Sequence, residues 1–472
     1  MENKAIQFIK NFFYTISSNL ISLIISTLVV IVVPKLVGVE EYGYWQLYLF
    51  YSSYVGFLHF GWSDGIYLRY GGEEYSDLDK KTFSSQFYMM MIFQFFIAVI
   101  IVIVAILFVN NNDRVFIFIM VALNALIVNV LSVLLLTLQA TNRIKNYAQI
   151  NIISRVSYII LILMFLFIGV REYRVMIVAD LMGKTLSLIY AIYACKDIVI
   201  NKLNTLNLSF TETIENIRVG IKLMFANIAS MLIIGVVRFG IEYSWDVSTF
   251  GKISLTLSVS NLLMLFINAT GIVIFPVLRK LSVEALPQLY LVVRDILMVI
   301  LFGILVLYFP MNALLTRWLP NYADSLAFMA LLFPISLYEG KMGLLINTYL
   351  KTLRKERFIM RVNMIVLLLS GISTIFTTVI FRNLNAAVLS ILIAISIRSI
   401  LAEKYLAEVL KINVIKDIIY ETTLTVLFVL IGWNINSIAG FALYLFAVIS
   451  YVFLKRKGLK DSFNKMKMYM ES

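Results

Sequence analysis

The chain has 472 residues, of which 61% are hydrophobic and 14% are charged, and its mean hydropathy is +0.91. Too few polar residues remain to coat a water-soluble body of this size, so the composition excludes a soluble protein and indicates an integral membrane protein. The one cysteine excludes an internal disulfide and a multi-cysteine metal site, and the one histidine, His59, argues against histidine-based metal or general-base chemistry.

Apolar runs of helical length, bounded by charges or by Pro, Gly and Asn, recur along the whole chain. The first run is expected to be a retained span and not a cleaved signal peptide, and to end at Pro34, which lacks a backbone donor. The second, from Tyr42, is expected to cross the bilayer as one helix. The sequence predicts fourteen spans, at 12–33, 42–68, 83–109, 115–140, 148–170, 174–195, 219–239, 250–275, 290–309, 324–350, 358–381, 386–410, 418–435 and 438–454.

Basic residues indicate the orientation, because lysine and arginine near span ends are retained on the cytoplasmic side. With the N-terminus inside, 26 of the 40 basic residues fall on the cytoplasmic side, seven on the opposite side and seven within the spans. Both termini are therefore predicted to be cytoplasmic. This bias accounts for most of the net charge of +13, and the basic tail from Lys455 suits an anionic leaflet, so no nucleic-acid partner is expected.

The two halves of the chain show a weak internal repeat. The segment 138–151 aligns with 350–363 at a shift of 212 residues, and Gly61 and Arg69 match Gly271 and Arg279 at a shift of 210. An even number of spans in each half makes such repeats parallel, although chance similarity remains an alternative. We therefore predict an all-α membrane protein of about fourteen helices, with two parallel six-helix repeats forming lobes around a central cavity. The predicted domains are an N-terminal lobe with linker (1–217), a C-terminal lobe (218–412), and an accessory helix pair with a basic tail (413–472).

Seven basic residues lie within the predicted spans: Arg155, Lys184, Lys252, Arg294, Lys341, Arg361 and Arg398. A charge in the bilayer centre needs a partner, an aqueous cavity or a way to the interface. Lys252, Arg294 and Arg361 lie near span ends and are expected to reach the interface. Lys184 follows Asp180 by four residues, which favours an ion pair on one helix face.

The remaining charges are candidates for a cationic substrate cavity. We select Arg398, Lys341 and Arg155, together with Arg238 at a helix end; Arg69, Lys184 and Asp64 are further candidates. Lys341 and Arg398 have no acidic residue at a favourable helical spacing, and a diphosphate suits arginine forks and lysine point charges. The alternative is interhelical ion pairing with Asp64, Glu242 or Glu339.

Several segments resemble the polysaccharide flippases, the Wzx-type exporters of O-antigen and teichoic acid. Pro34 followed by LVGVEEYGYW resembles the signature after their first helix. In the second half Arg238, Thr249 to Ser254, Gly271 to Pro276, and Leu344 to Arg357 are similar to their middle helices. Val237 stands where that family usually has an aspartate, which weakens the case for acid-based coupling at this position.

The resemblance implies two lobes, alternating access, and export of an undecaprenyl-diphosphate-linked oligosaccharide across the cytoplasmic membrane. We expect a multi-pass transporter with no cofactor and no enzymatic activity. Its expected partners are the lipid-linked oligosaccharide, membrane lipids, H+ or Na+ as coupling ion, and a polysaccharide polymerase. An ion-coupled multidrug exporter of the same fold is the first alternative. A membrane-embedded polymerase or ligase ranks last, because no outer loop carries clustered acid–base residues.

Overall fold

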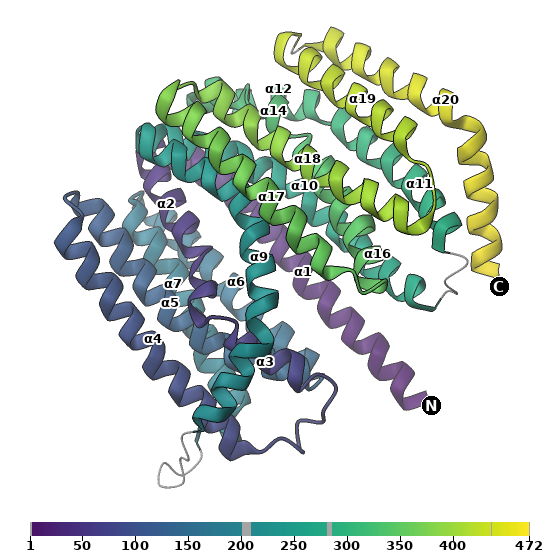
Figure 1. Cartoon of the computed structure of the whole chain (residues 1–472). Coiled ribbons are helices and arrows are strands. Elements are labelled where there is room, and N and C mark those ends of the chain that lie inside the picture. Colours follow the sequence, from purple (N-terminus) through teal and green to yellow (C-terminus); the bar gives the residue numbers. More distant parts are fainter. Residues whose placement is uncertain (1, 201–208, 281–285, 436, 472) are drawn as a thin grey trace. The chain divides into compact units, whose positions relative to one another are not determined.

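The computed structural model describes residues 2–200, 209–280, 286–435 and 437–471. Within these ranges side chains are described except at residues 2–9, 12, 263, 265–280 and 457–471. The described chain is helical and has no strand (Figure 1), which confirms the predicted fold class. Residues 201–208 of the predicted linker, and the surroundings of Gly271 and the side chain of Arg279 in the predicted repeat, lie outside this description.

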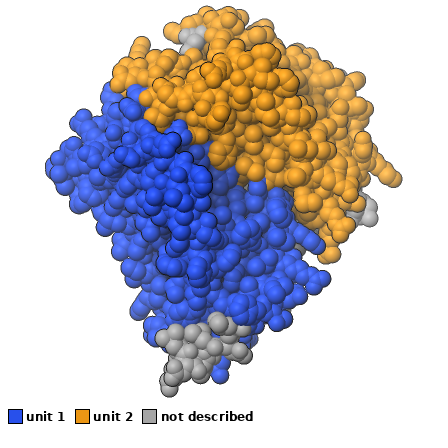
Figure 2. Space-filling model, turned by 60° about the vertical axis from the view of Figure 1, so that its left-hand side comes forward, with its two compact units in different colours: residues 1–228 blue, residues 229–472 orange. Residues whose placement is uncertain are grey.

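The chain divides into two compact units, residues 1–228 and 229–472, coloured separately in Figure 2. The division falls within one continuous helix, α9 (Phe210–Ser244). The predicted boundaries after residues 217 and 412 stay predictions.

The first unit contains seven helices before α9 and two short segments between them. In it α4 packs along α5, α6 packs along α7, and α1 packs against α6. Short connections make the sequential pairs antiparallel neighbours. Its elements are α1 (Glu2–Leu36), α2 (Val39–Ser52), the 3₁₀ turn η1 (Val55–His59), α3 (Trp62–Arg69), α4 (Lys80–Phe108), α5 (Asn112–Ala140), α6 (Ile144–Ile168), α7 (Tyr173–Ala194) and α8 (Lys196–Val199).

In the second unit α11 packs along α20, which also contacts α19, and α17 packs along α18 (Figure 1). Two π-helical segments, η5 and η6, interrupt its helices. Its elements are α10 (Val247–Lys280), α11 (Leu286–Val306), α12 (Tyr308–Trp318), η4 (Pro320–Tyr322), α13 (Ala323–Leu326), α14 (Met329–Leu332), α15 (Ile335–Lys341), η5 (Met342–Ile346), α16 (Asn347–Thr352), α17 (Glu356–Thr374), η6 (Ile375–Ile380), α18 (Leu384–Leu410), α19 (Ile415–Asn434) and α20 (Ile438–Glu471).

Eleven helices of the described chain are long and apolar enough to cross a membrane. They match eleven of the fourteen predicted spans. Two others, α10 and α19, form as helices at the predicted positions but are not among the eleven.

The prediction of one unbroken second span was wrong. The helix stops at Ser52, passes through η1, and restarts at Trp62 as α3. Phe60 (φ 52°) and Gly61 (φ 79°) adopt left-handed backbone conformations at the break, which only glycine takes without strain. Hydropathy cannot detect such a break, because apolar residues continue through it.

Glycines bring α3 against the first part of α9. A Cβ on Gly65 would lie 1.8 Å from the carbonyl oxygen of Asn216, and a Cβ on Gly220 would lie 1.9 Å from the carbonyl oxygen of Gly61. Two helix backbones therefore touch here, as small residues permit inside membranes. We infer that this close contact fixes the break in the second span.

Replacing Gly65 by alanine should lower the thermal unfolding temperature of the detergent-purified protein, because the added methyl group forces the two backbones apart. Overpacking of this kind typically costs about 1–3 kcal/mol. Gly303→Ala in α11 is the matched control, since its Cβ meets nothing within 4 Å. Equal unfolding temperatures for the two variants would show that the contact tolerates side chains.

The repeated loops share one backbone geometry. Asn142 (φ 58°) and Arg354 (φ 55°), which correspond at the shift of 212, are both left-handed. The following amides, of Arg143 and Lys355, donate to the carbonyls of Leu138 and Leu350 at 2.8 and 2.7 Å. These bonds belong to the same helix-ending motif, so the local sequence similarity corresponds to the same local structure.

Candidate functional site

Four buried charges form a closed ring in the second unit. Lys341 Nζ donates to Glu403 Oε2 at 2.7 Å and to Glu421 Oε2 at 2.6 Å. Arg294 Nε donates to Glu403 Oε1 at 2.7 Å, and its Nη2 donates to Glu421 Oε1. The four side chains are at most 1% exposed. Positive and negative charges alternate and balance, so the ring has no free charge for a ligand.

This ring contradicts the expectation for Arg294 and gives Lys341 partners that the sequence did not indicate. Arg294 was expected to reach the interface, but it is fully buried between two glutamates. Lys341 has two acidic partners that are 62 and 80 residues away in sequence. Its ammonium is fully buried and bonded to both carboxylates, so we do not carry it into the proposed binding site.

Arg398 lies near the middle of α18 and pairs with an acid of α15. Its Nη2 donates to Glu339 Oε2 at 2.5 Å, and its Nη1 donates to Ser230 Oγ at 2.9 Å. The Arg398 side chain is 3% exposed, whereas that of Glu339 is 25% exposed. The structure therefore contains the interhelical ion pair that was the alternative for Arg398.

Of three other candidates, Arg238 and Arg69 bind other residues of the protein, whereas Asp64 has no partner among the described residues. Arg238 donates to Ser254 Oγ at 2.9 Å and lies over the ring of Phe250. Arg69 connects α3 to α9 through Glu212 and Asn216, both at 2.6 Å. Asp64 is half-buried, and in the described part of the chain its carboxylate has neither a hydrogen bond nor an ion pair.

The predicted pair on α7 is confirmed. Lys184 Nζ donates to Asp180 Oδ2 at 2.5 Å and to Asn124 Oδ1 at 2.9 Å. Tyr48 adds a third contact, because its hydroxyl donates to the same Asp180 oxygen at 2.7 Å. Helices α2, α5 and α7 thus meet at one charged pair inside the first unit.

Arg155 differs from the other cations within the spans. It lies eleven residues after the start of α6, about 16 Å along the helix and so near its middle. Its side chain is exposed, and none of the described residues gives it a hydrogen bond or an ion pair. Arg361 is also exposed and unpaired, but it lies only five residues into α17, from where it reaches the interface easily.

Arg155 lines a polar pocket between α1 and α6. The pocket has a volume of about 180 Å³ and belongs entirely to the first unit. Seven of its eight lining residues are polar: Thr15, Ser18, Asn19, Ser22, Tyr147, Ala148, Asn151 and Arg155. No acidic residue lines it, so an anion can bind the guanidinium without displacing a protein carboxylate.

A row of polar side chains on α1 was not predicted from the sequence. Thr15, Ser18 and Ser22 recur at helical spacing and face the stripe of Tyr147, Asn151 and Arg155 on α6. The regular spacing of serine and threonine inside an apolar span could have revealed this polar face. Mean hydropathy does not reveal it, because it averages over all faces of the helix.

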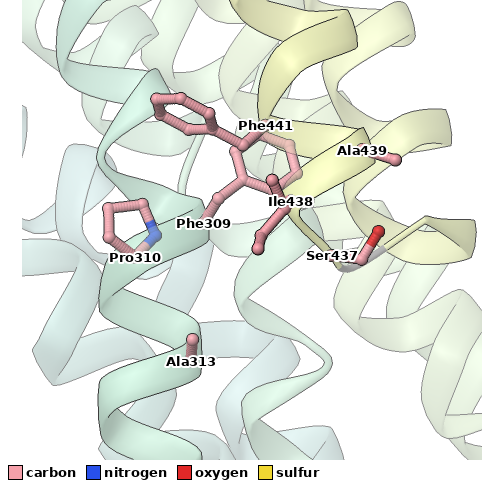
Figure 3. Close-up of a pocket in the computed structure, with 7 residues that line it drawn as sticks. All are labelled: Phe309, Pro310, Ala313, Ser437, Ile438, Ala439 and Phe441. Carbon is pink, nitrogen blue, oxygen red and sulfur yellow. The ribbon is translucent and has the colours of Figure 1, made fainter.

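A second pocket is almost wholly apolar and lies in the second unit (Figure 3). Its volume is about 740 Å³, and side chains of α12 face the start of α20 across it. The lining residues are Phe309, Pro310, Ala313, Ser437, Ile438, Ala439 and Phe441. It offers room for hydrocarbon but no group that recognises a headgroup.

A third pocket, of about 340 Å³, lies among loops of the first unit. Lys80 Nζ and the Arg143 guanidinium lie 3.5 and 3.7 Å from the centre of the Tyr75 ring. The Tyr75 hydroxyl donates to Asp197 at 2.7 Å, and burial, with this carboxylate, raises the pKa of Tyr75. Two cations face two acids, Glu74 and Asp197, so this pocket has no excess charge.

Known structures of low sequence identity share the fold. The lipid II flippase MurJ in its inward closed conformation is 14% identical, with 95% of this chain and 99% of that chain covered and a TM-score of 0.66. An inward-facing MATE family transporter of the MOP superfamily is 13% identical, with coverages of 83% and 98% and a TM-score of 0.65. A MOP superfamily transporter from Pyrococcus furiosus Vc1 is 14% identical, with coverages of 85% and 96% and a TM-score of 0.52. At these identities the similarity establishes the fold alone.

Comparison with curated proteins gives no match. The family model described as "Polysaccharide biosynthesis protein" matches residues 8–282, which is more than half of the chain and includes both helices of the Arg155 pocket. The chain therefore belongs to the polysaccharide biosynthesis protein family and has the helical fold of the MOP transporters.

Proposed function

We propose that this protein moves polyprenyl-diphosphate-linked oligosaccharides across the cytoplasmic membrane by alternating access. The observation that carries the proposal is Arg155, an exposed cation near the middle of α6 that has no partner among the described residues and lies in a polar pocket without acids. Membership of the polysaccharide biosynthesis family and the fold shared with a lipid II flippase support it.

The chemistry of the pocket suits the diphosphate end of such a lipid. An isolated cation in a membrane span is costly, and a bound anion removes that cost. The guanidinium donates two parallel hydrogen bonds to phosphate oxygens, while Ser18, Asn19 and Ser22 offer hydroxyl and amide groups for the remaining oxygens or the first sugar. A single arginine also limits the affinity for the diphosphate, so the substrate can leave on the other side of the membrane.

A drug exporter that binds cationic compounds needs accessible acids or apolar walls in its binding pocket. The pocket at Arg155 has the opposite charge. The orientation with both termini in the cytoplasm, predicted from the basic residues, is part of the proposal.

The proposal is tested with purified protein in liposomes that contain a fluorescent polyprenyl diphosphate carrying a disaccharide. Reduction of the fluorophore by external dithionite reports the fraction in the outer leaflet. We expect wild-type protein to make nearly all of the probe accessible, whereas protein-free liposomes protect the inner half. Export of ethidium without any movement of the diphosphate probe would replace the proposal with the drug-exporter alternative.

A further inference from the structure

We infer that the Arg155 pocket also selects the first sugar of the substrate, at a subsite formed by Thr15, Ser18 and Asn151. This sugar is the one joined directly to the diphosphate, and the groups recognised are its hydroxyl or acetamido hydrogens. The inference rests on the proposed function, which assigns the diphosphate to Arg155 and leaves open which residues select the sugar.

The two helix segments that line the pocket run in the same direction. Asn11 Nδ2 of α1 donates to Asn142 Oδ1, two residues before α6 begins, at 3.0 Å. The lining residues, 15–22 on α1 and 147–155 on α6, follow this hydrogen bond on both helices. Each residue of a helix adds about 1.5 Å, so positions four residues apart differ in depth by about 6 Å. The pocket therefore has an outer end near this hydrogen bond and an inner end farther along both helices.

The inner end is rich in hydrogen-bond donors. The Arg155 guanidinium has N–H donors and no acceptor, and Ser22 lies at a similar depth on α1. The oxygens of a diphosphate ester are acceptors only. The inner end therefore suits the diphosphate, in agreement with the proposed function.

The outer end offers oxygens that need a donor. Asn151 Nδ2 donates to the carbonyl oxygen of Tyr147 at 3.0 Å, and Thr15 Oγ1 donates to that of Asn11 at 2.9 Å. A carbonyl only accepts, so these bonds orient the Asn151 amide and use the hydroxyl hydrogen of Thr15. Asn151 Oδ1 and the Thr15 oxygen receive no hydrogen bond from the described residues. A phosphate cannot donate to them, whereas a sugar hydroxyl can.

Ser18 is independent evidence for a ligand at the outer end. Its side chain is 7% exposed and lines the pocket, and its hydroxyl has no hydrogen bond among the described residues. A buried polar group without a partner is costly, so such groups normally bind water or a ligand. The half-buried Tyr147 lines the same end, where its ring offers an apolar face to the C–H groups of a sugar.

The size of the pocket limits the subsite to one sugar. Its volume of about 180 Å³ equals the liquid volume of about six water molecules, which is comparable to a single monosaccharide. The Arg155 side chain is exposed, so a diphosphate bound to it lies at the edge of this volume and leaves the rest for the sugar. Further sugars of the oligosaccharide extend out of the pocket.

The test measures binding of synthetic lipids to the purified full-length protein. The probes are farnesyl diphosphate and three derivatives whose diphosphate carries glucose, galactose or N-acetylglucosamine. We expect at least one sugar to tighten binding at least tenfold over farnesyl diphosphate. Replacing the hydroxyl groups of that sugar by fluorine, which is of similar size but donates no hydrogen bond, should remove most of this gain. This comparison needs no substitution in the protein.

Asn151→Leu tests the subsite directly, because leucine has a similar size but no acceptor. It should reduce the gain from the sugar about threefold to tenfold, as expected for one hydrogen bond. Its affinity for farnesyl diphosphate should equal that of the wild type, which also shows that the variant is folded. Asn146→Leu is the matched control, since it makes the same substitution on α6 outside the pocket lining and should keep the full gain.

The inference is overturned if none of the three sugars tightens binding, if the fluorinated sugar binds as tightly as its parent, or if Asn151→Leu keeps the full gain. A wild type that prefers farnesyl diphosphate to farnesol but gains nothing from a sugar would reject this inference alone. A wild type without that preference would reject the proposed function, and this inference with it.

Discussion

Replacing Lys341 by alanine is expected to remove most of the protein from the membrane. Without its ammonium, Glu403 and Glu421 face each other in a fully buried site with only Arg294 to compensate them. Breaking a buried ion pair in this way costs about 3–5 kcal/mol, which is a large fraction of the roughly 5–15 kcal/mol by which proteins are stable. Immunoblots of the membrane fraction and thermal unfolding of the purified remainder measure the effect.

Two controls separate this loss from a general effect of substitution. The double variant Lys341→Met with Glu421→Gln removes one charge of each sign and leaves the Arg294–Glu403 pair, so it should recover much of the abundance. Lys252→Ala breaks only the ion pair with Asp324, whose side chain is 68% exposed, and should cost less than about 1 kcal/mol. Normal abundance and an unchanged unfolding temperature for Lys341→Ala would show that the ring contributes nothing to stability.

Replacing Arg155 by alanine should slow transport at least tenfold while leaving abundance normal. Nothing in the described protein depends on its guanidinium, so no acid is left unpaired. Loss of a charge-assisted contact to phosphate, worth about 1.5–3 kcal/mol, predicts at least a tenfold slower movement of the diphosphate probe. Arg155→Lys should be intermediate, because lysine keeps the charge but loses the two-pronged geometry.

Arg361→Ala is the matched control, since this arginine is also exposed and has no partner among the described residues but lies near a helix end. It should transport at the wild-type rate. Equal rates for Arg155→Ala and the wild type would remove Arg155 from the mechanism.

Composition and hydropathy were sufficient to predict the helical membrane fold. The alternation of apolar runs with short polar connections follows directly from the cost of leaving backbone groups unsatisfied in lipid. The break at Phe60 and Gly61 was not predictable in this way, because it depends on Gly65 and Gly220 in two segments far apart in sequence.

For the charged residues, too, contacts that are local in sequence were predictable and contacts between distant segments were not. Asp180 and Lys184 pair at a spacing of four residues, which local helix geometry predicts. The partners of Lys341, Arg294 and Arg398 lie on other helices and become visible only in the tertiary structure. Sequence alone therefore produced a list of cations within the predicted spans but could not distinguish those with ion-pair partners from Arg155, which has none among the described residues.

The central claim is that the Arg155 pocket binds the diphosphate of a polyprenyl lipid. Its most direct test is the affinity of the purified protein for farnesyl diphosphate compared with farnesol, in wild type and in Arg155→Ala. The claim predicts that the wild type prefers the diphosphate by at least tenfold, that this preference weakens as salt is raised, and that Arg155→Ala binds both compounds alike. An undiminished preference for the diphosphate in Arg155→Ala would contradict it.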